Sequence, residues 1–243
     1  MNPLNRFIDI VSGVFQPILG VLCATGMIKG VNAILLATGL VTEGSGSYII
    51  LNSIGDSLMY FFPIFLGFTA AKKFKLNQFL GIAIGASMVY PTITALAGTT
   101  INFLGIPVVM PSSGYASTVI PVIAAVYVAS KIEQMFKKII PDVVKTFLVP
   151  FCTLLVVVPL TFIVIGPITS TAGDLLGSVT SAIYNFSPLV AGLFIGGFWQ
   201  IFVMFGLHWG LVPIAFNNLA VLGYDSVLAV SVPVCFAQTG VVI

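Results

Sequence analysis

The stretch FGLHWGLVPIAFNN, residues 205 to 218, contains the single histidine of the chain, His208, beside Trp209 and far from any charged residue. Glycines flank the pair and a proline follows, a composition that loosens or ends a helix and frees backbone groups. At membrane depth, irregular backbone is tolerated only where it is buried in protein or lines a wet cavity. The stretch therefore predicts a polar site.

The side chains of this stretch are suited to a ligand that carries hydroxyl groups. An imidazole donates one hydrogen bond, accepts another and takes up a proton near neutral pH, so His208 can hold or deprotonate a hydroxyl. Trp209 offers a flat apolar face on which a sugar ring can lie. Asn217, Asn218 and Gln238 supply amides that pair with hydroxyls. The alternative is that His208 only satisfies a polar group of a neighbouring helix.

Other catalytic chemistries have no matching motif in the sequence. We find no paired-carboxylate motif, no phosphate-cradling G-x-x-x-x-G-K-[ST] and no cluster of metal ligands. Cys23, Cys152 and Cys235 are far apart in the sequence and lie in apolar surroundings, which indicates small core residues and neither a metal site nor a disulfide framework. We expect no metal, no cofactor and no complete enzyme in this chain.

The composition determines which elements must position these residues. Hydrophobic residues make up 58% of the 243 residues and charged residues only 7%, whereas soluble domains carry about 25% charged residues. This predicts an all-α, polytopic integral membrane protein, because long apolar runs span lipid as helices. A net charge of +2 is too small and dispersed for a nucleic-acid partner. The start of the chain lacks the pattern of a cleaved signal peptide, so we expect it to be mature sequence.

Long apolar runs predict six crossings and the start of a seventh. The predicted spans are residues 10–38, 48–71, 79–97, 115–130, 146–168 and 187–206, with the seventh beginning near residue 225. Gly81-x-x-x-Gly85 and Gly192-x-x-x-Gly196 predict close packing of helices within them. We interpret Lys29 as a snorkelling lysine and Asp56 as a helix-end aspartate, without assigning an ion pair.

The loops between these spans predict the orientation, because cytosolic loops are rich in lysine and arginine. Basic residues occur near the start, at residues 72–75 and in segment 131–145, whereas the alternate loops 39–47, 98–114 and 169–186 have none. We therefore expect a cytosolic amino terminus. Segment 131–145 places four apolar residues opposite its lysines, as an amphipathic helix along the inner membrane surface would: Ile132, Met135, Phe136 and Ile139. A solvated connector is the alternative.

Five stretches, in this order, resemble a known family over nearly the whole chain. They are NRFIDIVSGVFQPILGVLCATGMIKG (5–30), GDSLMYFFPIFLGFTAAKKF (55–74), FLGIPVV (103–109), YASTVIPVI (115–123) and FGLHWGLVPIAFNN. The family is the membrane-spanning IIC component of the bacterial phosphoenolpyruvate-dependent sugar phosphotransferase system. Within its glucose superfamily, the chain is similar to the β-glucoside branch.

The resemblance implies a sugar permease component of the bacterial plasma membrane. Such a protein binds a sugar of β-glucoside type from outside and presents its 6-hydroxyl to a phosphocysteine on a cytosolic IIB partner, which a IIA domain serves. The family's histidine in the quoted motif contacts the sugar, and His208 matches it. The family's homodimers imply a dimerisation half, residues 1–186, and the start of a sugar-binding half, residues 187–243. The family's glutamate, in a Gly-[Val/Ile]-Thr-Glu-Pro stretch, has no match before Ile243, so we expect a truncated chain.

Two other functions stay open at this point. A proton-coupled secondary transporter would use His208 as a proton relay, although Asp56 offers little support as a membrane carboxylate. A non-transporting fragment would use only its first five spans, to dimerise. The sequence does not identify the sugar, because specificity among hydroxyls depends on contacts that the sequence alone does not place.

Overall fold

The computed structural model describes residues 3–111, 114–116, 118–168, 171, 182–184, 186–205 and 229–242. These residues are mostly helical, as the composition predicts, and form two compact units. Unit 1 comprises Met1–Ala95 and Tyr115–Thr161, and unit 2 comprises Leu96–Gly114 and Phe162–Ile243.

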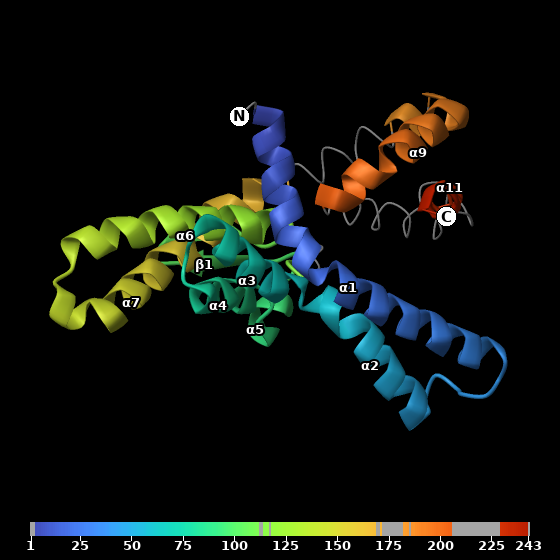
Figure 1. The fold of residues 1–243 in the computed structure, drawn as a ribbon, viewed down its shortest axis with the longest axis horizontal. Coiled ribbons are helices and arrows are strands. Elements are labelled where there is room, and N and C mark those ends of the chain that lie inside the picture. Colours follow the sequence, from blue (N-terminus) through green and yellow to red (C-terminus); the bar gives the residue numbers. More distant parts are fainter. Residues whose placement is uncertain are drawn as a thin grey trace. The chain divides into compact units, whose positions relative to one another are not determined.

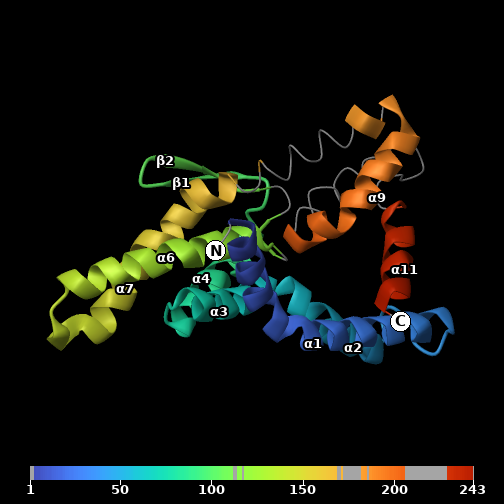
Figure 2. The ribbon, with the colours of Figure 1, turned by 45° about the horizontal axis from the view of Figure 1, so that its top comes forward.

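In unit 1, the first two helices form an antiparallel hairpin: α1 spans Pro3–Ala37 and α2 spans Gly46–Tyr60. They lie side by side in Figures 1 and 2. α1 changes direction part-way along (Figure 1), and Pro17 inside it removes a helical hydrogen bond. Ser45 caps α2, because its hydroxyl accepts a hydrogen bond from the Tyr48 N–H at 3.2 Å.

An ion pair joins the two helices of the hairpin. Lys29 Nζ lies 2.6 Å from Asp56 Oδ1, and Asn32 Nδ2 donates to the Tyr48 carbonyl at 3.4 Å. Asp56 lies inside α2 and not at a helix end, so our interpretation of the two charges as separate was wrong. The sequence alone does not show whether the two residues lie at the same depth along their helices. In the hairpin, Gly55 packs against Lys29, and this contact brings the neighbouring Asp56 to the level of Lys29.

Helices α3 (Phe62–Phe74) and α4 (Gln78–Met88) pack backbone against backbone. A methyl group added at Gly67 would overlap the Gly81 carbonyl oxygen, and one at Gly81 would overlap that of Gly67. A methyl group at Gly85 would likewise overlap the Pro63 carbonyl oxygen. The close packing predicted for Gly81-x-x-x-Gly85 is therefore confirmed.

Two further helices complete the core of unit 1: α6 spans Ile120–Ile139 and α7 spans Asp142–Leu160. The face that α6 buries continues past Ala129 through Ser130 to Glu133. Segment 131–145 is thus neither a separate amphipathic helix nor a solvated connector, because α6 runs through it to Ile139 and α7 begins after Pro141. Its predicted apolar stripe includes Met135 and Ile139, which are exposed.

Unit 2 contains a hairpin and two short apolar helices. Strands β1 (Thr100–Phe103) and β2 (Ile106–Val109) pair antiparallel (Figure 2), and Leu104 and Gly105 make the turn with positive φ. Loop 98–114 was expected only as a break between spans. Helix α9 spans Pro188–Phe205 and α11 spans Ser231–Val242.

α9 buries one stripe of side chains against its surroundings in unit 2. The buried members recur at helical spacing: Ala191, Ile195, Trp199 and Phe202. Added methyl groups at Gly192 and Gly196 would meet side chains of Val230 and Val234 at 3.4 Å or more. Among the described residues, these two glycines thus meet valine side chains and no backbone, so the predicted close approach at Gly192-x-x-x-Gly196 is not observed there.

Fewer helices qualify as membrane spans than the sequence predicts. In the part of the chain that the structure describes, two are long and apolar enough, Ser12–Ala37 and Asp142–Ile168. A third is the pair α2 and α3, bent by 43° at Phe61, where Pro63 has no N–H to continue the helix. The predicted span 79–97 is interrupted, because α4 ends at Met88 and α5 (Pro91–Thr94) begins anew at a proline. Six to seven crossings are thus not confirmed.

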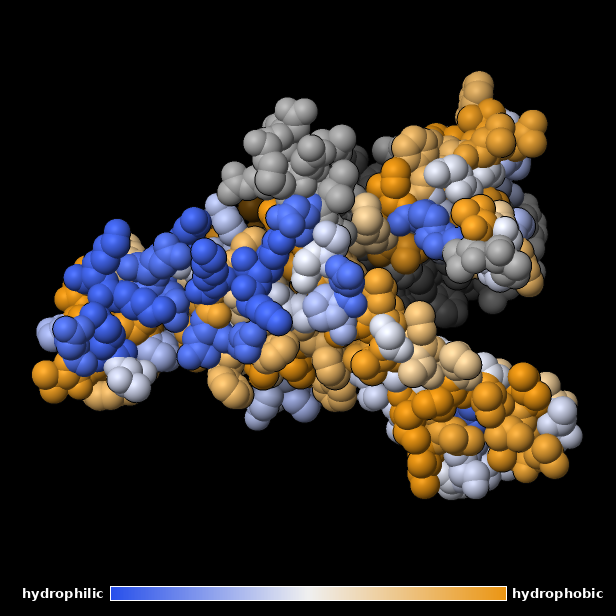
Figure 3. All heavy atoms as spheres, viewed as in Figure 1, coloured by the Kyte–Doolittle hydropathy of each residue, from blue (hydrophilic) through white to orange (hydrophobic). Residues whose placement is uncertain are grey.

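Lysines of α3, of the α3–α4 connection and of the α6–α7 segment lie on one side of unit 1, whereas Lys29 lies in the α1–α2 hairpin. Lys73 Nζ bonds Asp9 Oδ1 at 2.8 Å, which joins the start of α1 to the end of α3. Lysines of the α3–α4 connection and of the α6–α7 segment line one hollow. In Figure 3, hydrophilic side chains gather over these elements, whereas apolar side chains cover the α1–α2 hairpin. This agrees with the alternation of basic and uncharged loops in the sequence.

The substitution Gly81→Ala tests the α3–α4 contact. We expect it to destabilise the protein by about 1–3 kcal/mol, because the methyl group has no room beside the Gly67 carbonyl. Gly192→Ala is the matched control, since its methyl group would lie 3.9 Å from Val230, and we expect a change within about 0.5 kcal/mol. Thermal unfolding of the purified protein in detergent measures both. Equal Tm values for Gly81→Ala and the unsubstituted protein would contradict the close approach.

Exchange of the two charges tests the hairpin ion pair. Lys29→Ala or Asp56→Ala leaves an unpaired charge on apolar helices, and we expect each to lower stability by about 2–3 kcal/mol. The double substitution K29D/D56K restores the pair with opposite polarity and should recover most of that loss. Thermal unfolding in detergent again provides the measurement. A double variant no more stable than the single variants would show that the pair does not hold the hairpin.

Candidate functional site

Four of the five residues predicted from the sequence to bind a ligand fall between α9 and α11 in the sequence. His208, Trp209, Asn217 and Asn218 belong to residues 206–228, which lie outside the described residues. Their roles stay predictions. The two helices that flank them in the sequence, α9 and α11, are described.

An amide pair joins α9 to α11. Gln200 Nε2 donates a hydrogen bond to Gln238 Oε1, and both side chains are exposed. The other side chains of α9 are almost entirely apolar, so the polar amide of Gln200 is unusual in this helix. Gln238 was predicted as an amide for hydroxyls, whereas Gln200 was missed. An amide within an uncharged span is a signal that could have identified it.

The bond between the two amides leaves part of their hydrogen-bonding capacity free. An amide side chain has two N–H donors and a carbonyl oxygen with two lone pairs. In this bond, Gln200 uses one donor and Gln238 uses one lone pair. Among the described residues, no other hydrogen bond is observed for the side-chain carbonyl of Gln200 or the amino group of Gln238. The carbonyl can accept a hydrogen bond from a hydroxyl group, and the amino group can donate one to it.

Aromatic rings line the same helix as Gln200. The rings of Phe194 and Phe198 lie 5.2 Å apart, and those of Phe198 and Phe202 lie 6.2 Å apart in a stacked arrangement. Trp199 is buried in the stripe that holds α9 in unit 2. Trp199 therefore packs in the buried cluster of unit 2. The tryptophan predicted to support a sugar ring is a different residue, Trp209.

Groups suited to metals or to disulfide chemistry do not gather in the described part of the chain. Within it, no three His, Cys, Asp or Glu side chains are placed to hold a metal ion. Cys23, Cys152 and Cys235 are free thiols. Cys23 and Cys235 are exposed, so their interpretation as core residues was wrong. Both lie on helices whose apolar side chains are also widely exposed.

Comparison with known proteins extends the likeness over nearly the whole chain. The family described as "Phosphotransferase system, EIIC" matches residues 12–235. The chain is 60% identical to the "PTS system beta-glucoside-specific EIIBCA component" of Halalkalibacterium halodurans, over 98% of this chain and 40% of that protein. It is 40% identical to the component of the same name from Dickeya chrysanthemi, over 97% of this chain and 38% of that protein.

More distant relatives carry another sugar in their names. The "PTS system sucrose-specific EIIBC component" of Klebsiella pneumoniae is 32% identical, over 86% of this chain and 46% of that protein. No solved structure matches the chain. The chain spans less than half the length of these curated relatives.

A double-mutant cycle tests the amide pair. We expect Gln200→Leu and Gln238→Leu each to lower stability, since each leaves the other amide without its partner on an apolar helix. The double substitution should cost less than the sum, with a coupling energy of about 0.6 kcal/mol. Thermal unfolding of the four proteins in detergent measures it. Gln200→Leu paired with Thr239→Val is the control, because no bond between Gln200 and Thr239 is observed in the described part of the chain. Additive effects for Gln200 and Gln238 would contradict the pairing.

Proposed function

Because the chain belongs to the phosphotransferase system EIIC family, we propose that it is the membrane-spanning, sugar-binding part of a β-glucoside permease of that system. The observation that carries the proposal is the 60% identity, over 98% of this chain, to a component named as β-glucoside-specific. A second component of that name is more similar to the chain than the sucrose-specific one, at 40% against 32% identity. A β-glucoside is therefore the proposed substrate class.

The proposed reaction couples sugar uptake to phosphorylation. The sugar binds from outside, and its 6-hydroxyl receives a phosphoryl group from a phosphocysteine of a IIB domain at the cytosolic side. The sulfur–phosphorus bond breaks and the cysteine leaves as a thiolate, while an oxygen–phosphorus bond forms. The proton of the hydroxyl is released to a base and reaches the thiolate or the solvent. Phosphoryl transfer depends mainly on positioning and charge stabilisation. The new phosphate charge then disfavours return of the sugar through a neutral pathway.

His208 is the proposed contact that orients the sugar for this transfer. Its imidazole can accept a hydrogen bond from one hydroxyl and donate to another. Trp209 is proposed to support the ring face, and Asn217 and Asn218 to pair with further hydroxyls. The exposed Gln200–Gln238 pair supports the proposal, since it places free amide groups on helices that flank this stretch in the sequence.

The proposed topology has six to seven crossings and a cytosolic amino terminus. The placement of the lysines of α3, of the α3–α4 connection and of the α6–α7 segment on one side of unit 1 supports it, because cytosolic segments are rich in lysine. Residues 1–186 are proposed to form the dimerisation half of a homodimer, and residues 187–243 to begin the sugar-binding half. IIB and IIA domains are the proposed partners, since the relatives are named EIIBCA components.

Substitution of His208 tests the proposed function. We expect His208→Ala to lower phosphoenolpyruvate-dependent phosphorylation of an aryl-β-glucoside by about 100-fold or more, since the hydroxyl loses its orienting partner. The His208→Gln variant retains a hydrogen-bond donor and an acceptor, so its phosphorylation rate should lie between those of His208→Ala and the unsubstituted protein. The assay measures the rate at which phosphorylated sugar forms when IIB and IIA are supplied. Size-exclusion chromatography measures whether each variant is still a dimer.

Cys23→Ala on α1 is the control and should retain full turnover, because its exposed thiol has no role in the proposed reaction. Turnover of His208→Ala at the unsubstituted rate would refute the assigned role. Uptake of unmodified sugar that depends on a proton gradient would instead identify a secondary transporter.

A further inference from the structure

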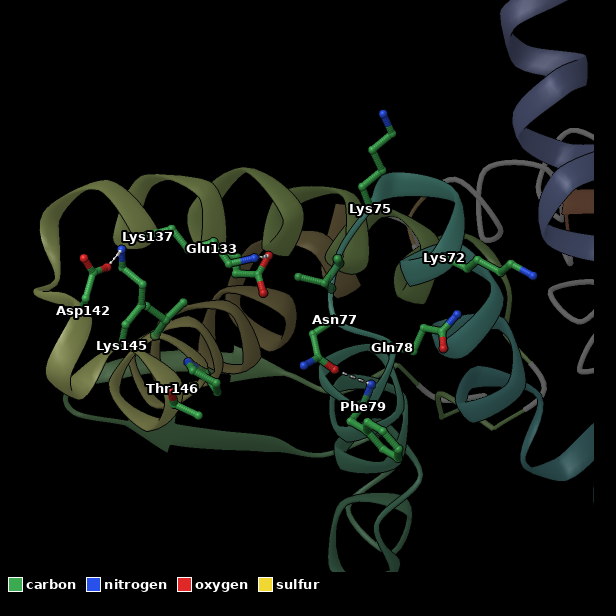
Figure 4. Close-up of a pocket in the computed structure, with 13 residues that line it drawn as sticks. Lys72, Lys75, Asn77, Gln78, Phe79, Glu133, Lys137, Asp142, Lys145 and Thr146 are labelled. Carbon is green, nitrogen blue, oxygen red and sulfur yellow. Dashed lines mark hydrogen bonds and ion pairs between the residues drawn. The ribbon is translucent and has the colours of Figure 1, made fainter.

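Unit 1 has an open hollow between the α3–α4 connection and the α6–α7 turn (Figure 4). Its volume is about 780 Å³, within the range of about 300–1,000 Å³ that small-molecule sites occupy. Four lysines and two amides line it together with apolar side chains: Lys72, Lys75, Lys137, Lys145, Asn77, Gln78, Leu76, Phe79, Val149 and Pro150. The proposed sugar site in unit 2 uses none of these residues.

The hollow carries an excess of positive charge. Both carboxylates that line it are already paired, Glu133 with Lys137 at 2.7 Å and Asp142 with Lys145. The Glu133 side chain is only 4% exposed and that of Lys137 is 50% exposed, so this pair presents mainly its ammonium group. Asp142 is exposed, and Lys145 compensates its charge.

Two lysines are left to attract an anion. Among the described residues, neither Lys72 nor Lys75 has a carboxylate within ion-pair distance. Both are exposed, and Figure 4 shows their side chains extending away from the two ion pairs and from the other residues that line the hollow. Their flexible stems can bring these groups to a phosphate bound there. The start of α4, at Gln78, adds a partial positive charge.

Apolar side chains beside the hollow place it at the boundary of a membrane. α7 begins here, at Asp142, and continues as one of the two helices long and apolar enough to cross a bilayer. Large apolar side chains are widely exposed on the elements that form the hollow: Phe79, which lines it, by 77%, and Val143 and Phe147, which belong to α7 but do not line it, by 92% and 64%. Lysines next to exposed apolar side chains at the end of a span are typical of the level of lipid headgroups.

We propose that this hollow binds an anionic phospholipid. The lysines and the Asn77 and Gln78 amides hold the phosphate-bearing headgroup, and the acyl chains lie along Phe79 and the start of α7. A soluble acidic protein would match the charge but would leave Phe79, in the hollow, and the exposed apolar side chains of α7 beside it without apolar partners. The combination of surplus lysines and exposed apolar side chains therefore favours a lipid as the occupant.

Titration with defined lipids tests the proposal on the intact purified protein. Delipidated protein in detergent is titrated with dioleoylphosphatidylglycerol, with dioleoylphosphatidylcholine and with inorganic phosphate, and native mass spectrometry counts the bound molecules. We expect tighter binding of phosphatidylglycerol than of phosphatidylcholine. In K72Q/K75Q, the apparent affinity for phosphatidylglycerol should fall by about tenfold or more, since each lysine near an anionic headgroup contributes roughly a factor of five.

The matched control is K131Q/K138Q. It removes the same charge from exposed lysines of α6 that do not line the hollow, and we expect its affinity to change less than twofold. Equal losses in the two double variants would show diffuse attraction to the whole basic face and overturn the proposal. Equal binding of the two lipids, or displacement of phosphatidylglycerol by millimolar phosphate, would overturn it too. Loss of phosphorylation by IIB in K72Q/K75Q with unchanged lipid affinity would assign the surface to an acidic protein instead.

Discussion

The contact between α3 and α4 is the interaction on which the rest of unit 1 depends. Gly67, Gly81 and Gly85 let the two backbones approach so closely that no methyl group fits between them. α1, α6 and α7 then pack around this pair, with Val122 of α6 reaching the same point. Because helices in lipid gain little from burying apolar surface, such close contacts contribute much of their association. The contact also fixes where the α3–α4 connection meets the α6–α7 turn, and so it positions the lysine-lined hollow.

The sequence predicted those parts of the fold that depend on composition and local spacing. Helical structure, the Gly81-x-x-x-Gly85 contact and the basic groups on one side follow from apolar runs, small residues and charge counts. It did not predict where a helix is interrupted, because Pro63 bends one span while Pro150 lies inside α7 without ending it. The Lys29–Asp56 pair was missed for a related reason, since depth along two helices depends on their packing.

In the candidate site, too, residue chemistry could be read from the sequence, whereas contacts that depend on packing could not. Residue chemistry alone selected His208 and its neighbours as candidates, because an imidazole, an indole and two amides are rare in an uncharged apolar stretch, and their roles stay predictions. Gln200 was overlooked, although it contacts Gln238, because a single amide inside a span has no pattern around it. Its partner is 38 residues further along the chain, and only the packing of α9 on α11 brings the two together. The family relationship supplies the sugar chemistry that neither pattern nor packing could provide.

The Lys29–Asp56 pair also constrains how the chain is made. When α1 leaves the ribosome, Lys29 has no counter-charge, because α2 has not yet been synthesised. Transfer of a lone ammonium group into hydrocarbon is costly, and pairing with a carboxylate lowers that cost. Entry of the first two helices into a bilayer as an ion-paired hairpin therefore costs less free energy than entry of α1 alone.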